Sequence, residues 1–202
     1  DNGCRAVVFS NPCNPTGEGF DREAVLSFVK NCPALCVVDE AYMDFWDQSI
    51  LDVAADCENL IVLRTLSKAY GAAGIRCGFA VGHKSLIDAL HVARSPYNVN
   101  TLTHVMARLV LELPEADSPA PFLAHQAQKL AAELRILLPG ATVSRTRTNF
   151  VYLRTGDAEK LAEGLARRGI AVRFFAPDHL RITASTDEEM KRLYAATKEV
   201  LS

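Results

Sequence analysis

The sequence lacks both a long apolar run and an excess of charge of one sign. No apolar stretch approaches the roughly 18 to 20 residues of a membrane-spanning helix, and no basic start followed by an apolar stretch indicates a signal peptide. The 22 basic and 24 acidic residues give a formal net charge of -2, which indicates neither a nucleic-acid surface nor an anionic-membrane surface. We therefore expect small-molecule partners, without nucleic acid or membrane, and a cytoplasmic location by default.

Cysteines and histidines are present, but not in a pattern typical of disulfides or metal sites. A chain of 202 residues, 49% of them hydrophobic, builds an adequate core without disulfides. Cys32 and Cys36 have no second cysteine or histidine pair at the spacing of a zinc finger. They are interpreted as small core residues, so no metal site is expected, and none of the scattered histidines is predicted to be a catalytic base.

Short apolar runs alternate with helical patterns through the first two thirds of the chain. Residues 6–9, 35–38 and 60–63 are rich in Val, Ile and Leu, which is typical of strands buried on both faces of a parallel sheet. The amphipathic stretch 22–30, with Asp21 as its N-cap, lies between the first two and predicts a strand-helix-strand unit. A further strand over 75–81 and helices over 84–94 and 101–112 follow. This part of the chain is therefore predicted to be α/β.

The last third of the sequence predicts a small α+β domain. Residues 114–121 shift in composition to Pro, Ser and Asp, which indicates a hinge or the start of a connecting helix over 122–138. Beyond it the predicted elements are a strand over 150–153, a helix over 158–168, strands over 171–174 and 180–183, and a helix over 187–201. We therefore assign residues 1–118 to a larger domain, and 119–202 to the connecting helix and a small C-terminal domain.

Polar side chains follow the three predicted parallel strands. Asn14 comes after the first strand, Asp39 after the second, and a cluster of Thr65, Ser67 and Lys68 after the third. The carboxyl ends of the strands in an open parallel sheet line one crevice, which is where ligands bind. We therefore expect these side chains to converge on one site, although each alone would also suit a turn or a solvated surface.

The chemistry of this set matches the requirements of pyridoxal 5′-phosphate (PLP). A lysine amine such as Lys68 forms an imine with an aldehyde when its pKa is low enough to supply free amine. Asp39 can keep a pyridine nitrogen protonated, and Tyr42 can hydrogen-bond a ring hydroxyl. Two hydroxyls and one cation near Lys68 suit phosphate oxygens: those of Thr65, Ser67 and Arg76.

Four motifs of the sequence carry a resemblance to a known family. They are residues 11–17 (Asn-Pro-Cys-Asn-Pro-Thr-Gly), 38–42 (Val-Asp-Glu-Ala-Tyr), 65–71 (Thr-Leu-Ser-Lys-Ala-Tyr-Gly) with 74–78 (Gly-Ile-Arg-Cys-Gly), and 180–183 (Leu-Arg-Ile-Thr). In order and spacing they resemble the fold type I (class II) aminotransferases, most of all the histidinol-phosphate aminotransferase family. The resemblance implies the PLP-dependent transferase fold, with residues 1–118 as the C-terminal part of its PLP-binding large domain.

The resemblance also implies a role for each residue. Lys68 would bond to the cofactor and, once released by substrate, move the proton between substrate and cofactor. Arg181 would grip the substrate α-carboxylate, with Asn149 as a further candidate in the same area. The implied cofactor contacts are Asp39 with the pyridinium, Asn14 and Tyr42 with the ring 3′ oxygen, and Thr65, Ser67 and Arg76 with the phosphate. Without the resemblance, Arg181 would equally suit a salt bridge and Asn14 a turn.

The activity implied by the resemblance is transfer of an amino group between histidinol phosphate, or a related amino acid, and 2-oxoglutarate. Its partners would be amino acid and 2-oxo acid substrates and a second subunit in a homodimer. Two alternatives stay open: a PLP lyase similar to threonine-phosphate decarboxylase, and a folded, non-catalytic fragment. Because the family extends further at the N-terminus and the chain does not begin with Met, we expect a truncated chain that is inactive alone and binds PLP weakly or not at all.

Overall fold

The computed structural model describes residues 3–112, 114 and 118–202 and divides the chain into two compact units. The first unit comprises Asp1–Pro12 and Gly19–Pro119, and the second comprises Cys13–Glu18 and Ala120–Ser202. Residues 115–117 of the predicted hinge lie outside the described residues. The assignment of 1–118 to a PLP-binding large domain and of 119–202 to a small C-terminal domain stays a prediction.

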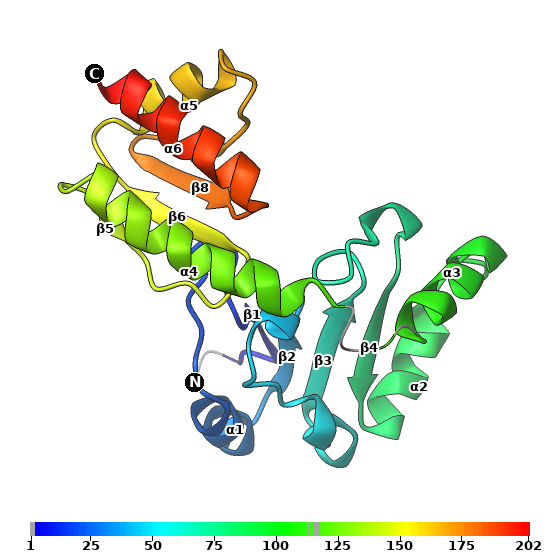
Figure 1. Cartoon of the computed structure of the whole chain (residues 1–202). Helices are drawn as coiled ribbons and strands as arrows, with labels where there is room; N and C mark the ends of the chain where they lie inside the picture. Colours follow the sequence, from blue (N-terminus) through cyan, green and yellow to red (C-terminus); the bar gives the residue numbers. More distant parts are fainter. Residues whose placement is uncertain (1–2, 113, 115–117) are drawn as a thin grey trace. The chain divides into compact units, whose positions relative to one another are not determined.

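The first unit is built on a four-stranded sheet in the order β1-β2-β3-β4 (Figure 1). The strands β1 (Ala6–Ser10), β2 (Leu35–Asp39) and β3 (Leu60–Thr65) are parallel, and β4 (Gly78–Gly82) is antiparallel to β3. The three predicted parallel strands are confirmed. Each extends slightly further toward its carboxyl end than the apolar run alone indicates, so that Asp39 and Thr65 are the last residues of their strands.

The fourth strand begins later than the sequence predicts. The expected strand over 75–81 is wrong at its start, because a 3-10 turn occupies Ala73–Ile75 and Arg76 has a φ of 54°. That left-handed conformation does not continue an extended strand. The antiparallel pairing then brings Gly78 so close to β3 that a Cβ at this position would lie 3.0 Å from the Arg64 carbonyl oxygen.

The helices of the first unit agree with the predicted ones. They are α1 (Arg22–Asn31), α2 (Lys84–Ala93) and α3 (Thr101–Leu111). Val25 and Val29 of α1 pack in a buried cluster with apolar side chains of the two central strands, including Cys36 and Val38 of β2. Asp21 occupies the N-cap position of α1, but its side chain makes no capping hydrogen bond.

The cysteines are free thiols, and three of them, Cys32, Cys36 and Cys57, belong to this core or pack against it. Cys36 is fully buried, and Cys32 packs against the same cluster. Burial, together with a hydrogen bond to Cys32, raises the pKa of Cys36 to about 11. The interpretation of both as core residues is therefore confirmed.

The second unit combines a four-stranded antiparallel sheet with three helices, as Figure 1 shows. The sheet order is β5-β6-β8-β7. Its strands are β5 (Thr142–Val143), β6 (Phe150–Arg154), β7 (Arg173–Phe175) and β8 (His179–Thr183), and its helices are α4 (Ala120–Leu137), α5 (Ala158–Ala166) and α6 (Asp187–Leu201). The predicted order of elements is confirmed. The sequence missed β5, which is too short to show alternation.

The three helices pack on one face of this second sheet. Strand residues alternate between faces, so Val151 and Leu180 join the buried side chains of α4, α5 and α6 in one core cluster. Their chain neighbours Tyr152 and Arg181, which are paired across β6 and β8, lie on the opposite face. The polar side chain of Arg181 on β8 therefore lies on the face of the sheet away from the helices. Among the helices of the described residues, none has the length and apolar character that crossing a bilayer requires.

The contact between α5 and α6 depends on Gly164, and this yields a test of the packing. A Cβ at Gly164 would lie 2.6 Å from Cγ2 of Val200. Alanine is favoured over glycine in helices by about 1 kcal/mol, but overpacking a core typically costs about 1–3 kcal/mol. Because valine is stiff at χ1, we expect Gly164→Ala to lower the free energy of unfolding of the second unit by about 1 kcal/mol.

Urea denaturation would measure this difference. Gly156→Ala is the matched control, because a Cβ at Gly156 meets nothing within 4 Å. Equal stability of the two variants would contradict the close packing of α5 on α6.

Candidate functional site

The end of β2 in the first unit presents the carboxylate of Asp39. Asp39 Oδ1 accepts the Ala41 N–H at 2.9 Å, and its carbonyl oxygen accepts the Asn11 N–H at 3.0 Å. Within the described part of the chain, Oδ2 has no hydrogen-bond partner. The side chain is partly buried, so a carboxylate of fixed direction and with one open oxygen stands at the carboxyl edge of the sheet.

Lys68 lies over the aromatic ring of Tyr42. The Lys68 Nζ is 5.3 Å from the centroid of the Tyr42 ring, within the range of a cation–π contact. Tyr42 is only 8% exposed, whereas Lys68 is exposed. The structure therefore brings together two of the predicted residues, with a buried ring beneath the amine of an exposed lysine.

The loop that carries Lys68 is fastened to the segment before β4. The Thr65 hydroxyl donates to the Cys77 carbonyl oxygen at 3.1 Å and accepts the Ser67 N–H at 3.1 Å. The Leu66 N–H also donates to the Cys77 carbonyl oxygen, at 3.1 Å. Thr65 thus shapes the loop on which Ser67 and Lys68 stand, and its predicted contact with a phosphate stays a prediction.

Arg76 is exposed and turned toward its own backbone turn. Its Nη1 donates to the Ala73 carbonyl oxygen at 3.1 Å. Among the described residues it shares no hydrogen bond with Thr65, Ser67 or Lys68. The carbonyl oxygen of the next residue, Cys77, is hydrogen-bonded to Thr65 and Leu66. The backbone at Arg76 is therefore held beside the loop that carries Lys68, whereas the Arg76 side chain is not.

The second unit contains the contact between Arg181 and Asn14. The Arg181 Nη1 donates to the Asn14 Oδ1 at 2.6 Å, and the guanidinium carbon lies 5.0 Å from the centroid of the Phe150 ring. Arg181 Nε is buried and has no hydrogen-bond partner among the described residues. Buried polar groups are normally satisfied, so this N–H suits an acceptor supplied by a ligand.

Asn14 reaches Arg181 because the segment Cys13–Glu18 folds onto the second unit. Gly17 has a φ of 74°, and a Cβ there would lie 3.1 Å from the Thr146 hydroxyl oxygen. The Arg147 N–H donates to the Gly17 carbonyl oxygen at 2.7 Å. The convergence of Asn14 with Asp39 and Lys68, which belong to the first unit, stays a prediction.

Two further polar residues, Asn149 and Arg173, lie on segments that are hydrogen-bonded to β8 or to its end. The Asn149 carbonyl oxygen accepts the Ala184 N–H at 2.8 Å, which ties the start of β6 to the end of β8. Arg173 was not predicted, yet β7 pairs it directly with Arg181. Two positive side chains directly opposite each other repel and destabilise the sheet. An anion bound between Arg173 and Arg181 would offset this repulsion. Its signal in the sequence was an arginine inside a predicted strand, but only the register of β7 and β8 reveals its partner.

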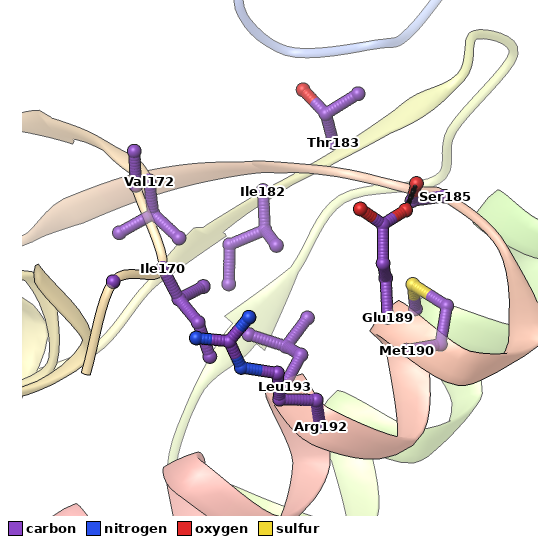
Figure 2. Close-up of a pocket in the computed structure, with 11 residues that line it drawn as sticks. Ile170, Val172, Ile182, Thr183, Ser185, Glu189, Met190, Arg192 and Leu193 are labelled. Atoms are coloured by element: carbon purple, nitrogen blue, oxygen red, sulfur yellow. Dashed lines mark hydrogen bonds between the residues drawn. The ribbon is translucent and has the colours of Figure 1, made fainter.

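A cavity of about 220 Å³ in the second unit contains none of the predicted site residues (Figure 2). It is lined by side chains of β8, α6 and the segment before β7, among them Ile182 and Leu193. Figure 2 shows its acidic residue, Glu189, beside Ser185. Hydrogen bonds from Ser185 and Thr186 lower the pKa of Glu189, and the Thr186 hydroxyl caps α6 by accepting the Glu189 N–H. Glu189 therefore serves the helix N-terminus.

Comparison with known proteins supports an aminotransferase relationship. The family model described as aminotransferase class I and II matches residues 1–196. A histidinol-phosphate aminotransferase of Thermoanaerobacter pseudethanolicus is 39% identical over 202 residues, which cover 98% of this chain and 57% of that protein. The chain thus spans little more than half the length of this curated relative.

Solved structures show the same fold. The crystal structure of histidinol-phosphate aminotransferase from Sinorhizobium meliloti in complex with pyridoxal-5′-phosphate superposes with a TM-score of 0.81 at 27% identity, covering 97% of this chain and 57% of that one. L-threonine-O-3-phosphate decarboxylase from Porphyromonas gingivalis gives a TM-score of 0.87 at 24% identity, covering 99% of this chain and 65% of that one; a likeness at that identity shows the fold alone. The expected α/β fold of PLP-dependent transferases is confirmed.

The two hydrogen bonds of the Thr65 hydroxyl can be tested directly. Thr65→Val keeps the side-chain shape but removes both bonds, and we expect it to lower the free energy of unfolding by about 1–2 kcal/mol. Hydrogen exchange at the Ser67 amide should accelerate, because that N–H loses its acceptor. Thr65→Ser, which retains the hydroxyl, is the control. Unchanged exchange at Ser67 in the valine variant would show that Thr65 does not hold the loop.

Proposed function

Because the chain belongs to the family of class I and II aminotransferases, we propose that it carries the cofactor-binding lysine and the substrate-binding arginine of a PLP-dependent aminotransferase. The proposed substrates are histidinol phosphate, or a related amino acid, and 2-oxoglutarate. The observation that carries the proposal is the position of Lys68 over Tyr42, three residues after Asp39, which ends a strand paired in parallel with the strand that precedes Lys68. A homodimer of the whole protein is part of the same proposal.

The residues of the first unit fit PLP. Asp39 offers an open carboxylate oxygen for the pyridine N–H, and Lys68 has an exposed amine on a flexible stem for the aldehyde carbon. The groups that would bind the phosphate are the hydroxyls of Thr65 and Ser67 and the guanidinium of Arg76. When bound, PLP supplies a sink for the electrons released at the substrate Cα.

Each of these side chains then has a definite task in the reaction. With PLP bound, Lys68 Nζ would move the proton between the substrate Cα and the cofactor, from a position over the Tyr42 ring. Asp39 would face the pyridine nitrogen and hold the proton there. Tyr42 would hydrogen-bond the ring oxygen, and Asn14 is proposed for the same oxygen.

The residues of the second unit fit an anionic group of the substrate. Arg181 can bind a carboxylate with two parallel N–H groups, one of them Nε, which has no partner in the described part of the chain. Asn14 and Phe150 hold the guanidinium in place, and Asn149 is proposed for the same substrate. Arg173, opposite Arg181, adds a second positive charge, which suits the phosphate of histidinol phosphate and the second carboxylate of 2-oxoglutarate.

A PLP lyase similar to threonine-phosphate decarboxylase is the second candidate, because the Arg173–Arg181 pair suits a phosphorylated amino acid equally well. The products separate the two functions. An aminotransferase converts 2-oxoglutarate to glutamate without releasing carbon dioxide, whereas the lyase releases carbon dioxide and needs no 2-oxo acid.

Borohydride reduction tests the assignment of Lys68. Reducing the complete gene product after loading with PLP should fix the cofactor on Lys68, which peptide mapping would identify. Lys68→Ala should abolish the label, whereas Lys84→Ala should retain it, because Lys84 is exposed and pairs with Asp88 on α2. A label on Lys84 or Lys160 would contradict the assignment.

Removing the guanidinium of Arg181 tests the substrate site. We expect Arg181→Ala to lower kcat/KM for amino donors by about 100-fold, since charge-assisted hydrogen bonds contribute about 1.5–3 kcal/mol each. The visible absorbance of bound PLP should be unchanged. Arg154→Ala is the matched control, because Arg154 is an exposed arginine of β6 that pairs with Asp178 at 2.6 Å. Unchanged kinetics with every amino donor would show that Arg181 does not bind the substrate and has a structural role only.

A further inference from the structure

Glu40 is a fully buried carboxylate next to Asp39. Its exposed fraction is 0%, and no other acidic or basic residue is buried in the described part of the chain. Moving a carboxylate out of water is costly unless its oxygens are fully hydrogen-bonded. The position of this one buried charge, one residue beyond the proposed cofactor carboxylate, therefore calls for a physical reason.

The carboxylate of Glu40 is satisfied by three donors from two segments. Oε1 accepts the Ile50 N–H at 2.8 Å, and Oε2 accepts the Ser49 hydroxyl at 2.6 Å and Arg64 Nη1 at 3.0 Å. Arg64 also pairs with Asp44 through Nη2. We call these five residues the Glu40 network: Glu40, Asp44, Ser49, Ile50 and Arg64.

The Glu40 network connects the chain neighbours of the proposed cofactor residues. Glu40 follows Asp39, and its N–H donates to the Leu63 carbonyl oxygen at 2.9 Å. Arg64 precedes Thr65, the last residue of β3 and the start of the loop that carries Lys68. The Met43 N–H, directly after Tyr42, donates to the Glu40 carbonyl oxygen at 3.0 Å. Backbone hydrogen bonds of Glu40 thus join the ends of β2 and β3 and the turn that carries Tyr42, and its buried carboxylate links the same region to Arg64 and to the segment of Ser49 and Ile50.

Stability alone does not account for this arrangement. Well-packed apolar side chains in place of a buried ion pair often leave a protein as stable or more so, because the charges lose their hydration. The free-energy cost of lost hydration is visible at Asp44, where burial raises the pKa of the carboxyl and the nearby Arg64 opposes the rise. What the ionic network adds is direction, because its hydrogen bonds hold backbone and side chains at defined angles.

We propose that Glu40 is a positioning residue, and that its network aims the Asp39 carboxylate and the Lys68 loop at the cofactor. This inference rests on the proposed function. Glu40 itself touches no reacting atom. Its effect is transmitted through the backbone on either side of Asp39 and Tyr42.

Glu40→Gln in the complete gene product tests the positioning role. Glutamine keeps the side-chain shape but places an N–H where a carboxylate oxygen faced a donor, so one of the three hydrogen bonds becomes a donor–donor contact. We expect the Kd for PLP to rise about tenfold. At saturating PLP, the visible circular dichroism of the bound ring should also fall, because that signal depends on ring orientation and not on global stability.

Asp88→Asn is the matched control for the loss of an ion pair in the same unit. Asp88 pairs with Lys84 at 2.6 Å on the surface of α2, and its removal should change neither the PLP affinity nor the dichroism. If Glu40→Gln does not fold, Asp44→Asn replaces it, since it removes a neighbouring partner of Arg64 while keeping Glu40. A smaller loss of PLP affinity, about threefold, is then expected.

The outcomes separate this inference from the function on which it rests. Failure of the unaltered gene product to bind PLP would overturn the proposed function, and the positioning role with it. Normal PLP binding by the unaltered protein, with unchanged affinity and dichroism in the folded Glu40→Gln or Asp44→Asn variant, would overturn the positioning role alone.

Discussion

The parallel pairing of β1, β2 and β3 is the constraint on which the first unit depends. Hydrogen bonding aligns Ser10 with Asp39, and Asp39 with Leu63, so these strands end at one edge of the sheet. Side chains placed just beyond those ends meet there, whatever their separation along the chain. Asp39, at the end of β2, and the loop that carries Lys68, after the end of β3, lie at that edge for this reason. Any change that shifted the register of β2 against β3 would separate them.

The reversal at β4 closes the loop that carries Lys68. A strand antiparallel to β3 must pass close to its backbone, and glycine at 78 and 82 permits this: a Cβ would lie 3.0 Å from the Arg64 carbonyl oxygen at the first position and 2.7 Å from the Leu60 carbonyl oxygen at the second. The return also brings the Cys77 carbonyl oxygen to the Thr65 hydroxyl. The conformation of the lysine loop is therefore set from both of its ends.

Along each strand of the second unit, side chains alternate between the two faces of the sheet, so the core residues lie on one face and the proposed substrate-binding arginine lies on the other. Leu180 and Ile182 face the helices, so Arg181 between them must face the other way. That face holds a guanidinium whose Nε lacks a partner among the described residues, with Asn14 on one side and the ring of Phe150 beneath it. An arginine held in this way is pre-organised for a planar anion, since it need not be ordered again when the anion binds.

The sequence by itself determined the order of the helices and of the longer strands in both units, and it supplied the chemical groups of the proposed site. Apolar runs and helical periodicity are local properties, so the strands over 35–38 and 60–63 and the helices that follow could be predicted directly, whereas their ends at Asp39 and Thr65 could not. Motifs with several residues at fixed spacing likewise made Lys68, Asp39 and Arg181 the candidates for the site, because such combinations are rare. Only the tertiary structure decided the left-handed turn at Arg76, the pairing of Arg173 with Arg181, and the burial of Glu40 against Arg64. Each depends on which segments, distant in the chain, lie side by side, and no local pattern of residues encodes that register.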